Sequence, residues 1–110
     1  MPSTNSGTIS TLNDRFRRTF QGGSVLMTPG IHALGETGVA SVLQKVRQFN
    51  SFTPDNDPYG EHDFGSFDHD GQKVFWKIDY YDLDQKFASP DPADPAVTMR
   101  VLTVMLAAEY

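Results

Sequence analysis

The Asp70-Gly71 pair is the feature that most constrains how this chain can fold. It lies between two segments rich in aromatic and β-branched residues, 63–69 and 72–81. An Asp-Gly pair in that setting favours a two-residue type I′ turn, because both central residues of such a turn need positive φ. We therefore predict a β-hairpin whose register is set by this turn.

The predicted register sorts the side chains of the hairpin onto two faces, because successive side chains of a strand point to opposite sides. Gly65 lies opposite Trp76 and leaves room for the indole ring. The expected core face holds Phe67, Val74, Trp76, Ile78 and Tyr80. The other face pairs Asp68 with Lys73, Phe64 with Lys77 and His62 with Asp79.

Aromatic residues also occur on the second face, at Phe64, Phe75 and Tyr81. Exposed aromatic side chains often mark interaction surfaces. The alternative is that the acidic, proline-rich loop 82–95 covers them. The sequence leaves both interpretations open.

Two helices and a strand are predicted before the hairpin. Apolar spacing indicates helices over 8–20 and 36–49. The segment 24–28 predicts a short buried strand, and residues 1–7 are expected to form a disordered lead.

The last predicted element is a buried helix over 96–109. It follows Asp94-Pro95, a pair typical of a helix start, and is apolar around most of its circumference. The expected order is therefore α-β-α-β-β-α. This predicts a single α+β domain over 8–110, with about three antiparallel strands and the helices packed on one face.

Length and composition narrow the class of protein. A chain of 110 residues has the usual size of one domain. The absence of cysteine excludes disulfides, thiolate metal sites and cysteine nucleophiles within these residues. We expect a cytoplasmic protein, because the N-terminus lacks the features of a secretory signal and no apolar run reaches the ~18 residues of a membrane span.

The net charge of −5 is unevenly distributed along the chain. Residues 1–50 hold five basic and two acidic residues, a net of +3, whereas residues 51–110 hold four basic and twelve acidic residues, a net of −8. This excess of carboxylates disfavours nucleic acid and favours a protein partner with a basic surface. We expect neither a nucleic-acid nor a membrane partner, and the oligomeric state is left open.

Several of these acidic residues fall near the open end of the predicted hairpin and form the candidate binding site. The site consists of Asp55, Asp57, Glu61, His62, Asp63, Asp79, Tyr81, Asp82 and Asp84. Carboxylates with one histidine would suit Mg²⁺, Mn²⁺ or Ca²⁺. The interpretation that we favour has no metal, no cofactor and no catalytic residue, because acidic residues in such loops usually cap turns.

Three segments of the chain carry a resemblance to a known family. They are 53–65 (TPDNDPYGEHDFG), 75–82 (FWKIDYYD) and 89–95 (SPDPADP). These segments resemble a family of small bacterial proteins, a domain of unknown function found in alphaproteobacteria and their plasmids. The resemblance implies no activity. By analogy with plasmid accessory genes, it suggests a mobile-element role such as anti-restriction or anti-CRISPR inhibition of host defence.

Three functions follow as hypotheses. We favour a small acidic, non-enzymatic domain that occupies a basic surface on a partner protein. The alternative is a small metal-dependent or acid–base enzyme in which Asp79 orients His62. A third hypothesis is a structural subunit that forms homodimers.

Overall fold

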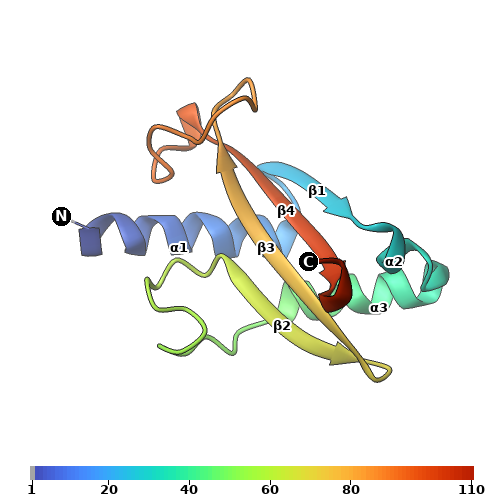
Figure 1. The fold of residues 1–110 in the computed structure, drawn as a ribbon. Helices are drawn as coiled ribbons and strands as arrows, with labels where there is room; N and C mark the ends of the chain where they lie inside the picture. Colours follow the sequence, from blue (N-terminus) through green and yellow to red (C-terminus); the bar gives the residue numbers. More distant parts are fainter. Residues whose placement is uncertain (1) are drawn as a thin grey trace.

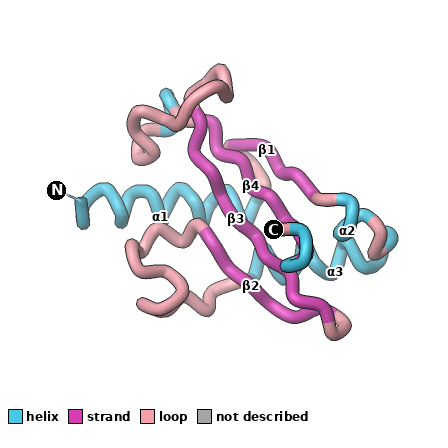
Figure 2. The backbone as a smooth tube through the Cα atoms, viewed as in Figure 1, coloured by secondary structure: helices cyan, strands magenta, loops and turns pink. Residues whose placement is uncertain are grey.

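The structure, a computed structural model, describes the backbone of residues 2–110. Its elements are α1 (Pro2–Thr19), β1 (Gly23–Met27), α2 (Pro29–His32), α3 (Gly35–Gln48), β2 (Phe64–His69), β3 (Gln72–Tyr81), the 3₁₀ turn η1 (Pro95–Val97), β4 (Met99–Leu106) and the 3₁₀ turn η2 (Ala107–Glu109). The predicted α+β class is confirmed. Helices α1 and α3 lie on one face of a single sheet (Figures 1 and 2).

The sheet has four strands in the order β1-β4-β3-β2. β1 is parallel to β4, and the pairs β4–β3 and β3–β2 are antiparallel. The expected three-stranded antiparallel sheet is thus wrong in strand number and in the direction of β1. We call the face turned away from α1 and α3 the open face.

The predicted final helix is wrong, since residues 99–106 form the strand β4. β4 is an inner strand with buried side chains on both faces, so its apolar residues do not alternate with polar ones. Such a run resembles a buried helix in its pattern alone. The predicted cap is present: the carboxylate of Asp94 accepts a hydrogen bond from the Ala96 amide, but it begins only the short turn η1.

Helix α1 begins at Pro2, so residues 2–7, expected as a disordered lead, belong to this helix, and Met1 lies outside the described residues. Proline is well suited to the first turn of a helix, where its missing amide hydrogen would have no partner. The strand predicted at 24–28 and the helix predicted at 36–49 are confirmed, with small shifts, as β1 and α3.

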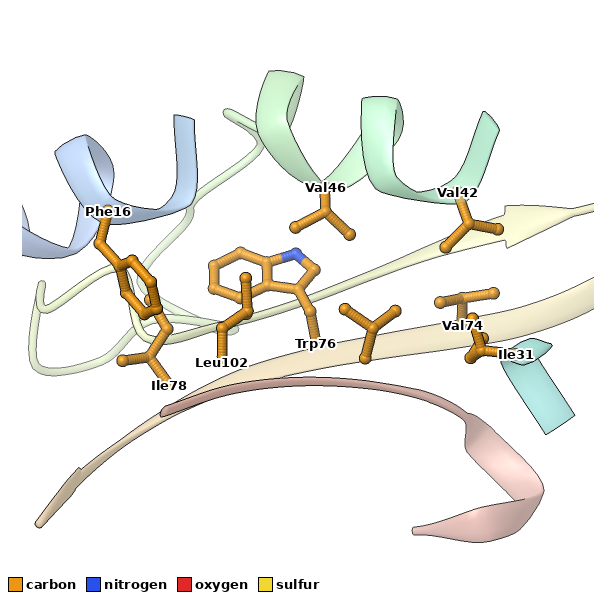
Figure 3. Packing of buried hydrophobic residues seen from close by; sticks show 9 residues of the cluster. Phe16, Ile31, Val42, Val46, Val74, Trp76, Ile78 and Leu102 are labelled. Carbon is orange, nitrogen blue, oxygen red and sulfur yellow. The ribbon is translucent and has the colours of Figure 1, made fainter. Parts of the chain in front are cut away.

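The predicted hairpin register is confirmed. Gly65 pairs with Trp76 and Phe67 with Val74, and the turn residues Asp70 and Gly71 have φ of 50° and 81°. The core lies between the sheet and the two longer helices, where the Trp76 indole is fully enclosed (Figure 3). The other members of this buried cluster are Phe16, Ile31, Val42, Val46, Val74, Ile78, Leu102 and Val104. In the part of the chain that the structure describes, no helix is both long and apolar enough to cross a membrane.

Candidate functional site

Four carboxylates converge at the open end of the hairpin, as the sequence predicted. We call Asp57, Glu61, Asp63 and Asp79 the acidic end. Burial raises the pKa of Asp63, and the charges of Glu61, Asp57 and Asp79 raise it further. Within the described residues, no cation lies at ion-pair distance from the half-buried Asp63 carboxylate.

The loop between α3 and β2 builds this end from its own turn chemistry. The carboxylate of Asp57 accepts hydrogen bonds from the amides of Glu61 (3.1 Å) and His62 (3.3 Å). The side chain of Asp57 is only 6% exposed. Asp57 therefore shapes the loop and contributes its charge, but it does not present its oxygens to a partner.

The predicted pairing of His62 with Asp79 is wrong. His62 has a φ of 57°, a left-handed conformation that does not fit a regular strand. The strand β2 therefore begins after this residue, at Phe64. Its Nδ1 lies 3.0 Å from the Asp14 carboxylate of α1, and its ring stacks on Phe52 with centroids 3.9 Å apart. Asp79 instead pairs with Lys77 at 2.7 Å.

This arrangement weakens the acid–base hypothesis. Nδ1 of His62 faces Asp14, and Nε2 lies 3.7 Å from the Asp57 carboxylate. Both ring nitrogens thus face carboxylates other than that of Asp79. Among the side chains that the structure describes, no group of three or more histidine, aspartate or glutamate residues is arranged to hold a metal ion.

A buried polar network supports the acidic end from behind. Asn13 of α1 donates hydrogen bonds from Nδ2 to the Glu61 carbonyl (3.0 Å) and to the Tyr80 hydroxyl (2.8 Å). The Tyr80 hydroxyl in turn donates to the Glu61 carboxylate at 3.0 Å. Burial raises the pKa of Tyr80, so the phenol stays protonated as a donor. The Glu61 carboxylate is therefore held in one position.

A buried arginine closes the network at β4. Arg100 donates from Nε to Oδ1 of Asn13 at 2.8 Å and from Nη2 to the Pro92 carbonyl. Burial lowers its pKa, and the negative charge of Glu61 acts in the opposite direction. Arg100 thus links β4 to the loop after β3.

A second buried arginine, Arg17, fastens α1 to α3. Its guanidinium donates to the Val46 and Arg47 carbonyls at the end of α3 and to Asp14 at 3.0 Å. It also lies 5.1 Å from the centroid of the Trp76 ring, within the range of a cation–π interaction. Sequence reasoning missed Arg17, Arg100 and Asn13, because an isolated polar residue on an apolar face gives no signal of its burial.

The remaining predicted site residues lie around this end. Asp55 and Asp84 are exposed on their loops. Asp82 caps a turn, accepting a hydrogen bond from the Lys86 amide at 3.0 Å. Tyr81 lies on the open face with Asp79, where both line a hollow in the sheet. The predicted binding residues therefore occupy three different environments. Asp55 and Asp84 are exposed on loops, Asp57 and Glu61 are held by hydrogen bonds, and Asp79 and Tyr81 lie on the open face.

Comparison with known proteins assigns the family. The family model described as "Protein of unknown function (DUF3768)" matches residues 27–109, so the chain belongs to this family. No curated protein and no solved structure gives a significant match. The expected membership in a domain-of-unknown-function family is confirmed, whereas the alphaproteobacterial and plasmid origin stays a prediction.

Proposed function

We propose that this member of the DUF3768 family is a non-enzymatic binding domain whose acidic end docks on a basic surface of a partner protein. The observation that carries the proposal is the Asp63 carboxylate: it is half-buried, surrounded by three other carboxylates, and has no cation at ion-pair distance within the described chain. Gathering like charges in this way opposes folding. A guanidinium or ammonium group from a partner would relieve that repulsion and form charge-assisted hydrogen bonds.

The rigidity of the acidic end supports this function. Tyr80 and Asn13 hold Glu61, and Asp57 locks the backbone beneath it. A preorganised set of acceptors loses little conformational entropy when a partner binds. Exposed Asp55 and Asp84 extend the negative potential outward and would accelerate encounter with a basic partner.

The identity of the partner is the finer part of the proposal. The excess of carboxylates in residues 51–110 and the resemblance to plasmid-borne proteins favour a host-defence protein whose basic surface normally holds DNA. The acidic end would occupy that surface, as in anti-restriction or anti-CRISPR inhibition. The mechanism would be steric and electrostatic, without bond chemistry.

The test compares two variants that each remove one negative charge. Partners are captured from a bacterial lysate on the immobilised wild-type protein, and the Kd of each purified partner is then measured at rising salt. We expect Asp63→Asn to weaken binding at least about tenfold, ~1.4 kcal/mol. Asp70→Asn is the matched control, because the Asp70 side chain is 89% exposed and lies in the turn at the opposite end of the hairpin.

The expected pattern is a loss at Asp63, little change at Asp70, and a Kd that rises steeply with salt. Equal losses for both variants would show that only net charge matters. Binding that is insensitive to salt, or no partner at all, would contradict the proposal.

A further inference from the structure

The open face of the sheet carries a hollow of about 500 Å³. Its floor includes Val101, Thr103 and Met105 of β4, and Leu26 of β1 lies at its side. Leu26 is 54% exposed and adds apolar surface beside the hollow. This face is thus less covered than the opposite face, on which α1 and α3 pack (Figure 1).

An aromatic cluster lies beside the hollow. Phe75 contacts Phe64 and Tyr110, with ring centroids 5.3 Å and 5.6 Å apart. Tyr110 is 72% exposed and also lines the hollow. The open face therefore presents both a projecting aromatic side chain and a depression.

The loop after β3 contributes one residue to the lining of the hollow. Of that loop, Gln85 lines the hollow, whereas the apolar side chains of Leu83 and Phe87 are 59% and 74% exposed. Of the three aromatic residues in question, Tyr81 is bridged to Ala88 of the loop, whereas Phe64 and Phe75 contact each other. The loop turns back along the end of β3, where Ser89 donates its amide hydrogen to the Tyr80 carbonyl.

The charges of the open face are balanced, in contrast to those of the acidic end. Lys77 and Asp79 are successive residues on this face of β3 and form an ion pair with each other. The Glu109 carboxylate is already bonded to the Thr28 hydroxyl and to the amides of Gly30 and Leu106. A purely basic ligand would therefore form few new ion pairs with the open face. A surface that carries one positive and one negative charge at the same spacing would be complementary to Lys77 and Asp79.

We propose that the occupant of the open face is a second copy of this chain, related by a two-fold axis. In a two-fold interface the same patch meets itself, so a projection and a depression on one face complement each other. Tyr110 of each copy would enter the hollow of the other. Lys77 would face the partner's Asp79, and Asp79 the partner's Lys77. The ion pair is then buried among four reciprocal charges.

The first test measures molar mass by sedimentation velocity from about 1 µM to about 1 mM protein. We expect the wild type to become dimeric within this range and Leu26→Asp to raise the dimer Kd at least about tenfold. Leu83→Asp is the matched control, since Leu83 is similarly exposed but is not among the residues that line the hollow. Circular dichroism shows whether each variant is folded.

The second test exchanges charges and does not depend on the Leu26 variant. Lys77→Asp and Asp79→Lys each place two like charges on the face, so each alone should dimerise more weakly than wild type. A 1:1 mixture of the two should form heterodimers, because the two negative charges of one variant then face the two positive charges of the other. A monomeric wild type, equal losses at Leu26 and Leu83, or a mixture no more associated than its components would overturn the proposal. All of these readouts are molar masses of the protein without the partner of the acidic end, and Leu26→Asp leaves the four carboxylates of that end unchanged.

Discussion

Gly65 lies directly opposite Trp76 in the β2–β3 ladder. A β-carbon added at Gly65 would lie 2.6 Å from Cε2 of the indole ring, which is too close for two carbon atoms. Trp76 is completely buried, and α3 packs over it, so the ring has no room to move (Figure 3). We expect Gly65→Ala to lower the free energy of unfolding by about 1–3 kcal/mol, the usual cost of overpacking a core. Urea denaturation followed by tryptophan fluorescence measures this directly.

The control for this substitution is Gly7→Ala. Gly7 lies in α1, and an added β-carbon there meets nothing within 4 Å. Alanine favours a helix over glycine by about 0.5–1 kcal/mol, so Gly7→Ala should be neutral or stabilising. An unchanged stability for Gly65→Ala would mean that the indole is less tightly enclosed than the structure shows.

Asn13 is the junction of the buried polar network, and its replacement should be costly. Asn13→Leu keeps the volume but leaves Arg100 Nε, the Tyr80 hydroxyl and the Glu61 carbonyl without their bonds to Asn13. Hydrogen bonds to charged groups contribute about 1.5–3 kcal/mol each, so we expect a loss of at least about 2 kcal/mol. Thermal unfolding of this variant is compared with that of Gln44→Ala, an exposed position on α3. Similar melting temperatures for the two variants would contradict the role of the network.

Asp63 should make the protein less stable as pH rises. Its pKa is raised in the folded state by burial and by nearby carboxylates, so the folded protein holds this proton to higher pH than the unfolded chain. The contribution to stability is complete below the unfolded pKa, near 3.9, and is lost as pH rises through the folded value. We expect Asp63→Asn to be more stable than wild type at pH 7, with the difference vanishing in acid.

This prediction is checked by urea denaturation of both proteins from acidic to neutral pH. If Asp63→Asn is less stable than wild type at pH 7, the carboxylate has a stabilising partner and the proposed docking role fails. A more stable but weaker-binding variant would instead show that the charge is kept for recognition at a cost in stability.

Glu109 has the opposite pH dependence. Hydrogen bonds from Thr28, Leu106 and Gly30 lower its pKa, so it stabilises the fold above the unfolded pKa and this contribution is lost as pH falls through the folded value. We expect Glu109→Gln to melt at a lower temperature than wild type at pH 7 and to lose less stability on acidification. Asp84→Asn, which removes an exposed charge on a loop, should leave both properties unchanged.

The hairpin could be predicted from the sequence because its cause is local. Asp70-Gly71 sets the turn, and period-two alternation then places Phe67 and Trp76 on one side. The strand β4 was missed because it lies between two other strands and is buried on both faces, which gives a continuous apolar run. Such a run does not distinguish a buried strand from a buried helix. The β-branched residues of that run, Val101, Thr103 and Val104, were the signal that favoured a strand.

The candidate site was predicted in composition but not in pairing. The convergence of Glu61, Asp63 and Asp79 follows from the hairpin and is present. The left-handed backbone at His62 directs its ring toward Asp14, a residue 48 positions earlier in the chain. No spacing rule connects residues that far apart, so contacts of this kind are found only once the fold is known.

The position of β4 has a consequence for synthesis on the ribosome. Within the described residues, β1 pairs with β4 alone, and the paired residues are 77 positions apart, as are Ser24 and Val101. A nascent chain that has released α1, β1 and α3 therefore cannot complete the sheet until the last strand emerges. Folding should thus be late and nearly all-or-none, and chaperones would meet an apolar β1 without its partner for most of translation.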